Sequence, residues 1–143
     1  MEPLIYDRTQ EEVEYALNHP ESTSFLVGAY NFIDLNRIET WSAYIAEQLN
    51  LYNYNVSITT KTNWTFDDFP TRSEMKRIRD NVQKLKDAFM AFTSVPADLE
   101  RMTYQKANDL EKVLHELDNL INNMIASFYY SGTFYSGESE GLL

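Results

Sequence analysis

The apolar residues of residues 103–130 recur at steps that alternate between three and four. They are Ala107, Leu110, Leu114, Leu117, Ile121, Met124 and Phe128. This spacing gives a helix one apolar stripe, which must be buried against other helices. At 1.5 Å per residue the helix would be about 40 Å long. The pattern therefore predicts a central helix that begins after Thr103 as its N-cap and ends before Gly132, a natural C′ residue.

Residues 72–92 carry the same spacing of apolar positions. The stripe consists of Met75, Ile78, Val82, Leu85, Phe89 and Phe92. Thr71 and Glu74 stand three residues apart before it, which is the spacing of a capping box. Because a linker of about ten residues is enough to reverse the chain, we expect this helix and the central helix to form an antiparallel hairpin.

Two further helices precede this pair. Asn31 is a good N-cap with Asp34 at the third helical position, and it opens a helix that we expect to end near Leu51. Its apolar face consists of Leu35, Ile38, Trp41, Ile45 and Leu49, and Arg37, Glu39, Glu47 and Gln48 are expected to lie mostly away from it. Thr9 with Glu12 predicts a short helix that ends near Asn18.

Tyr54, Val56 and Ile58 alternate with polar residues, which is the period-two pattern of a strand. Since a single strand is not stable alone, we expect residues 54–60 to pair with one of the chain ends. The predicted fold is therefore mainly α: an antiparallel helical bundle of three long helices plus a short N-terminal helix, with this minor β element. We expect one domain over residues 1–143, with an N-terminal arm over 1–8 and a tyrosine- and glycine-containing tail over 131–143.

Composition narrows the functional classes. The chain has no cysteine, which excludes disulfides, thiolate catalysis and cysteine-based metal sites. Its net charge of −10 opposes binding to nucleic acid. The six basic residues of residues 72–92 are expected to form a solvated face or to pair with the acidic N-terminal segment of this chain or of a neighbouring copy: Arg72, Lys76, Arg77, Arg79, Lys84 and Lys86. We see no apolar run long enough to span a membrane and no secretory signal pattern, and we expect synthesis in a cytoplasm.

Two groups of residues are candidates for chemistry. His115 with Glu111, Glu116 and Asp118 could suggest a metal or a base, but a metal site needs three or four converging ligands, so a solvated helix face is favoured. Asp67 and Asp68 could pair with Glu21 or Asp34 as an acid/base couple acting on cell-wall glycans, although adjacent carboxylates in a loop usually form a turn. We therefore expect no catalytic residues, no cofactor and no metal, and not an enzyme.

Aromatic residues are numerous outside the helical stripes. The chain has ten tyrosines, eight phenylalanines and two tryptophans, more than a small helical core can absorb. Rigid rings bury much area at low entropic cost and are enriched at interfaces. The predicted protein-interface residues are Tyr6, Trp64, Phe66, Tyr129, Tyr130, Phe134 and Tyr135.

Several short pieces of sequence, spread over almost the whole chain, carry a resemblance to a known family. They are residues 4–10 (LIYDRTQ), 28–31 (GAYN), 34–37 (DLNR), 60–64 (TKTNW), 120–124 (LINNM), and the repeated YSG of 130–132 and 135–137. With these pieces the chain resembles a family of small proteins encoded by phages and prophages of Firmicutes, in or near the virion-structure genes. The family has no assigned activity, so no catalytic residue is carried over. The stretch between the first helix and Gly28 is shorter here than the family pattern suggests.

The resemblance implies a phage virion structural protein that acts by assembly, as a component of the tail, baseplate or collar. Its expected partners are other virion proteins and copies of itself, and neither a membrane nor nucleic acid. It would be made in the cytoplasm of the bacterial host and end in the virion. The alternative function is a small acidic phage-encoded inhibitor that binds a host nucleic-acid-binding protein, which the net charge of −10 suggests.

Overall fold

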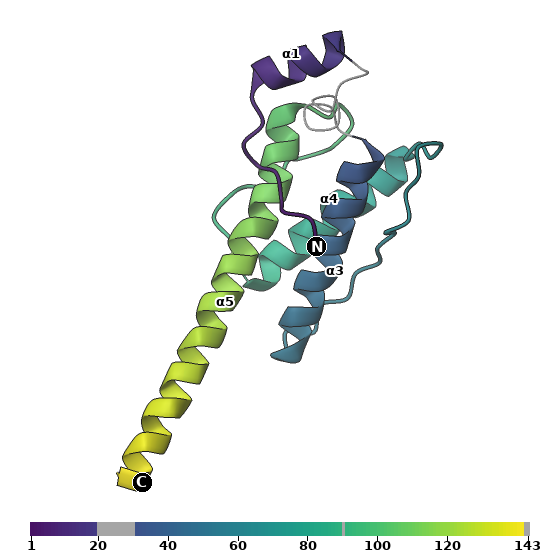
Figure 1. The fold of residues 1–143 in the computed structure, drawn as a ribbon. Coiled ribbons are helices and arrows are strands. Elements are labelled where there is room, and N and C mark those ends of the chain that lie inside the picture. Colours follow the sequence, from purple (N-terminus) through teal and green to yellow (C-terminus); the bar gives the residue numbers. More distant parts are fainter. Residues whose placement is uncertain (20–30, 90, 142–143) are drawn as a thin grey trace.

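The computed structural model describes residues 1–19, 31–89 and 91–141, with side chains as far as Phe128. This part of the chain contains the helices α1 (Gln10–Asn18), α3 (Phe32–Leu51), α4 (Arg72–Phe89) and α5 (Tyr104–Gly141). The three long helices pack on one another, and α1 lies at one end of them (Figure 1). The predicted mainly α helical bundle is confirmed.

The helices begin at their predicted caps, which are Thr9, Asn31, Thr71 and Thr103. At α3 the cap is reciprocal. The Asn31 side chain accepts from the backbone N–H groups of Ile33 and Asp34, and the Asp34 carboxylate accepts from the Asn31 N–H. Such bonds satisfy donors that have no partner inside the helix.

The core lies between α3, α4 and α5. Most of its fully buried members come from the predicted stripes: Ile38, Ile45, Leu49, Ile78, Val82, Leu85, Leu110, Leu114, Leu117 and Ile121. Val113 is also 0% exposed but was not part of a predicted stripe. Removing this apolar surface from water is the main force that holds the three helices together. The periodicity of the sequence therefore identified the buried face of each long helix.

The helix α5 runs in the same direction as α3. In its first third, Glu111 of α5 accepts a hydrogen bond from Arg37, which lies near the start of α3. At the other end of α3, the ring of Tyr52 lies 6.1 Å from the ring of Phe128 in α5. Both helices descend together in Figure 1.

The helix α4 also runs in the same general direction, at an oblique angle (Figure 1). Arg72 at its start pairs with Glu100 of the following linker, so the linker returns along α4 before α5 begins. Thr93, just past the end of α4, donates its N–H to Glu116, well inside α5. The antiparallel hairpin that we expected for α4 and α5 is therefore wrong, because the linker is long enough to run back along α4.

The predicted strand is also wrong, since the described part of the chain contains none. Residues 54–60 bind side chains instead of a second strand. The Asn50 amide accepts from the N–H of Val56 and donates to its carbonyl. The Thr59 carbonyl accepts from Asn81 and Arg77 of α4. These polar side chains supply the hydrogen bonds that a partner strand would have supplied, and Asn55 has a positive φ of 54°.

The helix α5 is longer than predicted. It does not end at Gly132 but continues to Gly141, so that residues expected to form a loose tail are helical. Its 38 residues correspond to about 57 Å of helix. Figure 1 shows its last third extending beyond the end of α3 and away from the other helices.

Candidate functional site

Four charged side chains meet in the interior where the N-terminal arm crosses α3 and α5. They are Arg8 of the arm, Asp34 and Arg37 of α3, and Glu111 of α5. Glu111 accepts from Arg8 Nη2 at 2.6 Å and from Arg37 Nε at 2.6 Å. Asp34 accepts from both arginines. Asp34 and Glu111 are each 0% exposed, so two buried acids are balanced by two buried arginines.

The environment of this cluster shifts the pKa values of its members. Burial disfavours the charged carboxylate and raises the pKa of Asp34, although the charges of Arg37 and Arg8 act in the opposite direction. Burial alone would lower the pKa of Arg37, but its hydrogen bonds with Glu111 and the charges of Glu111 and Asp34 outweigh that effect and raise it. Guanidinium groups bind both carboxylates. We therefore interpret the cluster as one that holds the arm, α3 and α5 together, and not as an acid/base pair.

The cluster fixes the course of the N-terminal arm. The Ile5 N–H donates to Glu111, and the Asn108 side chain both accepts from the Arg8 N–H and donates to the Arg8 carbonyl. Between these anchors, Tyr6 lies at the surface, stacked on His115 with 4.4 Å between ring centroids. The arm thus presents Tyr6, 37% exposed, on the outer side of α5.

Sequence reasoning missed this cluster. Glu111 was assigned to a solvated face and Arg37 to the side of α3 away from the core, and both assignments are wrong. Two signals in the sequence could have identified them. Glu111 lies four residues after Ala107, which places it on the same face of the helix as the apolar stripe. Asp34 and Arg37 are spaced as an i,i+3 ion pair.

Trp64 is at the centre of a second buried network, with Glu39 of α3. Its indole Nε1–H donates to Glu39 Oε2, and Arg77 of α4 pairs with the same carboxylate. The Asn36 side chain accepts from the Trp64 N–H and donates to its carbonyl. Trp64 is 3% exposed and belongs to the core, so its assignment to an interface with another protein is wrong.

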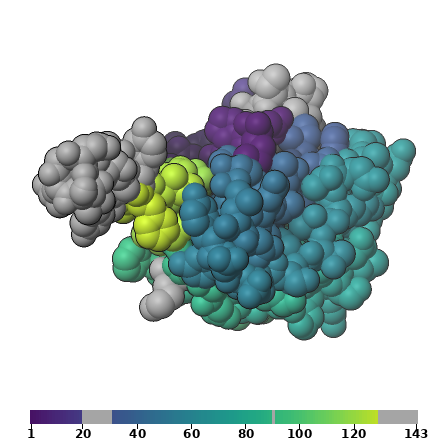
Figure 2. Space-filling model, turned by 90° about the horizontal axis from the view of Figure 1, so that it is seen from below, coloured from purple at the N-terminus to yellow at the C-terminus, as the bar shows by residue number. Residues whose placement is uncertain are grey.

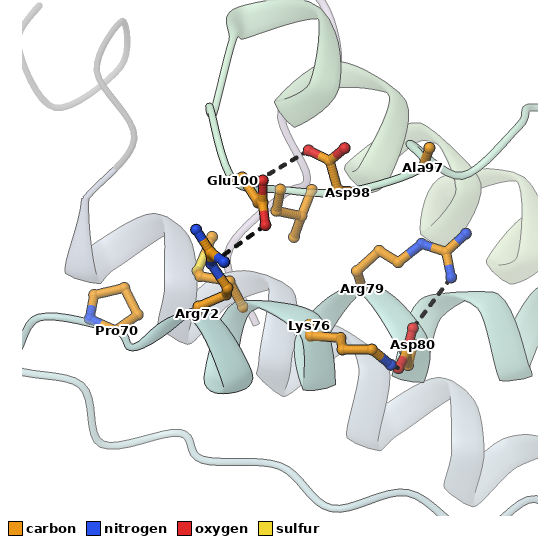
Figure 3. A pocket seen from close by; sticks show the side chains of 10 residues that line it. Pro70, Arg72, Lys76, Arg79, Asp80, Ala97, Asp98 and Glu100 are labelled. Carbon is orange, nitrogen blue, oxygen red and sulfur yellow. Dashed lines mark hydrogen bonds and ion pairs between the residues drawn. The ribbon is translucent and has the colours of Figure 1, made fainter.

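A cleft of about 470 Å³ lies between α4 and the linker that precedes α5. Figure 3 shows the charged side chains along it, whose pairs are Arg72–Glu100, Lys76–Asp80 and Arg79–Asp80. Arg79 also donates to the Pro96 carbonyl. These basic residues of α4 are therefore paired with acids of α4 and the linker, not with the acidic N-terminal segment. The cleft has no excess of one charge that would select an ionic ligand.

A second cleft, of about 400 Å³, opens where α5 leaves the bundle. Its lining is mainly apolar and aromatic: Leu51, Tyr52, Asn53, Tyr54, Met124 and Phe128. Asn53 has a positive φ of 68°, which asparagine tolerates, and the chain turns there after α3. Figure 2 shows this end of α3 next to the last described side chains of α5. Leu51 and Phe128 are 67% and 60% exposed. We call these six residues the basal cleft.

The other predicted interface residues are placed as follows. Phe66 is 80% exposed, and its ring meets the edge of Phe32 at 6.4 Å. The side chains of Tyr129, Tyr130, Phe134 and Tyr135 lie outside the described residues, although their backbone is part of α5. The prediction also missed strongly exposed aromatic or aliphatic side chains elsewhere, which include Leu17, Leu51, Phe69, Phe92 and Phe128. Single-sequence patterns do not distinguish them from core residues.

Of the acidic candidates, Glu21 lies outside the described residues, and the others do not converge on a reactive centre. Asp68 accepts hydrogen bonds from the N–H and hydroxyl of Thr65. The Thr65 N–H in particular lowers the pKa of Asp68, so this carboxylate closes a turn, as its loop position suggested. In the described ranges, no three His, Asp or Glu side chains are grouped so as to hold a metal ion. The helices described here also lack the length and apolar character that crossing a bilayer would require.

Comparison of the chain with protein-family models, with curated proteins and with solved structures found no match.

Proposed function

We propose that this chain is a phage virion structural protein that acts by assembly, as a component of the tail, baseplate or collar. The class comes from the family resemblance of the sequence. The observation that supports it best is the shape of α5, whose last third extends beyond the bundle (Figure 1). A helix as short as this last third is marginal in water when it is isolated. A helical segment that leaves its own domain is therefore typical of one that packs on a partner.

Exposed apolar rings support the same role. Phe66, Phe69, Phe92 and Phe128 are 80%, 86%, 85% and 60% exposed. Large aromatic rings are enriched in the buried centres of interfaces between proteins. The four exposed rings are distributed over loops and helix ends, which suits a component with several neighbours in a particle.

The acidic side chains favour a structural role over catalysis. Asp34 and Glu111 are held by arginines, Glu39 by Trp64 and Arg77, and Asp68 by its own turn. A glycan-cleaving enzyme needs two carboxylates that face a substrate across a cleft. The buried carboxylates of this chain already have their hydrogen bonds within the fold.

Particles of the phage that encodes the chain provide the test. Gradient-purified particles and total lysate would be compared by quantitative mass spectrometry, with a replication protein of the same phage as the matched control. We expect this chain to be enriched together with the major virion proteins while the control is depleted. Depletion of both would refute the proposal. If the chain were then recovered with a host nucleic-acid-binding protein, the inhibitor hypothesis would replace it.

A further inference from the structure

A long uncharged segment spans the part of α5 that leaves the bundle. Asp118 and Glu138 are consecutive charged residues of the sequence, and the nineteen residues between them, 119–137, carry no charge. The whole chain has a net charge of −10, and like net charges oppose the association of two copies. Residues 119–137 add no charge of their own to that repulsion.

The buried stripe of α5 continues into this segment. Leu114, Ile121 and Phe128 follow one another at seven-residue steps, and their exposure rises from 0% and 1% to 60% as the helix leaves the bundle. Tyr135 is the next residue in this series. A seven-residue spacing keeps one face of a helix directed at a neighbouring helix. The seam that α5 uses inside the bundle is therefore extended, in sequence, beyond the end of the bundle.

Two glycines lie in the part of α5 that leaves the bundle. Gly132 and Gly137 are within α5, and each glycine inside a helix costs about 0.5–1 kcal/mol relative to alanine. Figure 1 shows the last third of α5 extending away from the other helices. Packing against a second molecule would offset this cost.

We infer that residues 119–137 of α5 pack against the same segment of a further copy of this chain, with the basal cleft at the edge of the interface. A second copy fits because it supplies an equally uncharged segment with the same seven-residue series. The inference depends on the proposed function, for which it names one partner. The contact is a helix-to-helix seam that includes Phe128 and Tyr135.

Sedimentation equilibrium of the purified full-length chain, over a hundredfold range of concentration, tests this directly. Phe128→Glu and Tyr135→Glu place a charge in the seam, and Ala126→Glu is the matched control. Ala126 is exposed, and at 3.6 residues per turn it lies on the opposite side of the helix from Phe128. We expect the first two variants to raise the dissociation constant at least about tenfold, as loss of a central interface residue does, and the control about threefold or less.

Circular dichroism and thermal unfolding at low concentration check that each variant keeps its fold. We expect Phe128→Glu to remain folded, because the Phe128 side chain is 60% exposed. A wild-type chain that is monomeric at every concentration would overturn the inference, as would a control variant that dissociates as readily as Phe128→Glu. If the chain is monomeric but present in particles, the self-association is refuted and the proposed function stands. If the chain self-associates but is absent from particles, the proposed function is refuted and the self-association stands.

Discussion

Replacing Glu111 by glutamine should destabilise the protein severely although the side chain keeps its shape. Glu111 is 0% exposed and accepts hydrogen bonds from the Ile5 N–H, from Arg8 and from Arg37. Glutamine removes the negative charge and turns one acceptor into a donor that faces other donors. Asp34 would then be the only anion beside two buried guanidinium groups.

The magnitude follows from the balance of charges. The native cluster has two acids and two arginines, so it is neutral, whereas the variant buries a net positive charge. Removing one partner from a buried ion pair costs about 3–5 kcal/mol, because the remaining charge stays desolvated. A domain of this size is stable by roughly 5–15 kcal/mol, so the loss would be a large part of the total.

Urea unfolding followed by tryptophan fluorescence would measure this loss, since Trp64 is buried in the native state. Glu100→Gln is the control, because it makes the same chemical change at a side chain that is 53% exposed and pairs with Arg72. We expect the control to change stability by about 1 kcal/mol or less. If Glu111→Gln cost no more than the control, the conclusion that the cluster holds the arm to the bundle would be refuted.

Three other predictions concern single contacts. Trp64→Phe keeps an aromatic ring but removes the bond to Glu39, and it should cost about 1.5–3 kcal/mol in the same unfolding assay. Asn31→Ala removes the cap of α3 and should cost about 0.5–2 kcal/mol, whereas Asn31→Gly should cost less. Because the Asp68 pKa is lowered in the folded state, its contribution is present above the unfolded pKa and is lost as the pH falls through the folded pKa. Asp68→Asn should therefore make the loss of stability in acid shallower, and an unchanged pH profile would contradict this role.

The sequence was sufficient for features that depend on local chemistry. The caps at Thr9, Asn31 and Thr71 bind their own backbone within three residues, and the apolar stripes are read from spacing alone. The directions of the helices were not predictable in this way. They depend on the path of the linkers, and the path after α4 is set by contacts between residues far apart in sequence, such as those of Arg79 with the Pro96 carbonyl and of Thr93 with Glu116.

The candidate site also combines features that the local sequence predicts with features that depend on residues distant in the sequence. Phe66 is 80% exposed, whereas Trp64, two residues earlier, is buried because Asn36 and Glu39 of α3 bind it. Buried ions were missed because a charged residue is normally solvated, and only its partners make burial tolerable. Arg8 and Glu111 become partners through the fold itself, so no local pattern indicates the pair.

The separation of Arg8 and Glu111 by 103 positions has a consequence for synthesis. A ribosome that adds about 5–20 residues per second exposes the arm and α3 well before Glu111 has left the exit tunnel. During that interval Arg8, Asp34 and Arg37 hold one negative charge against two positive ones, and the surface of α3 that receives α5 is open to water. The buried cluster that ties the arm to the bundle can therefore form only after α5 has been synthesised.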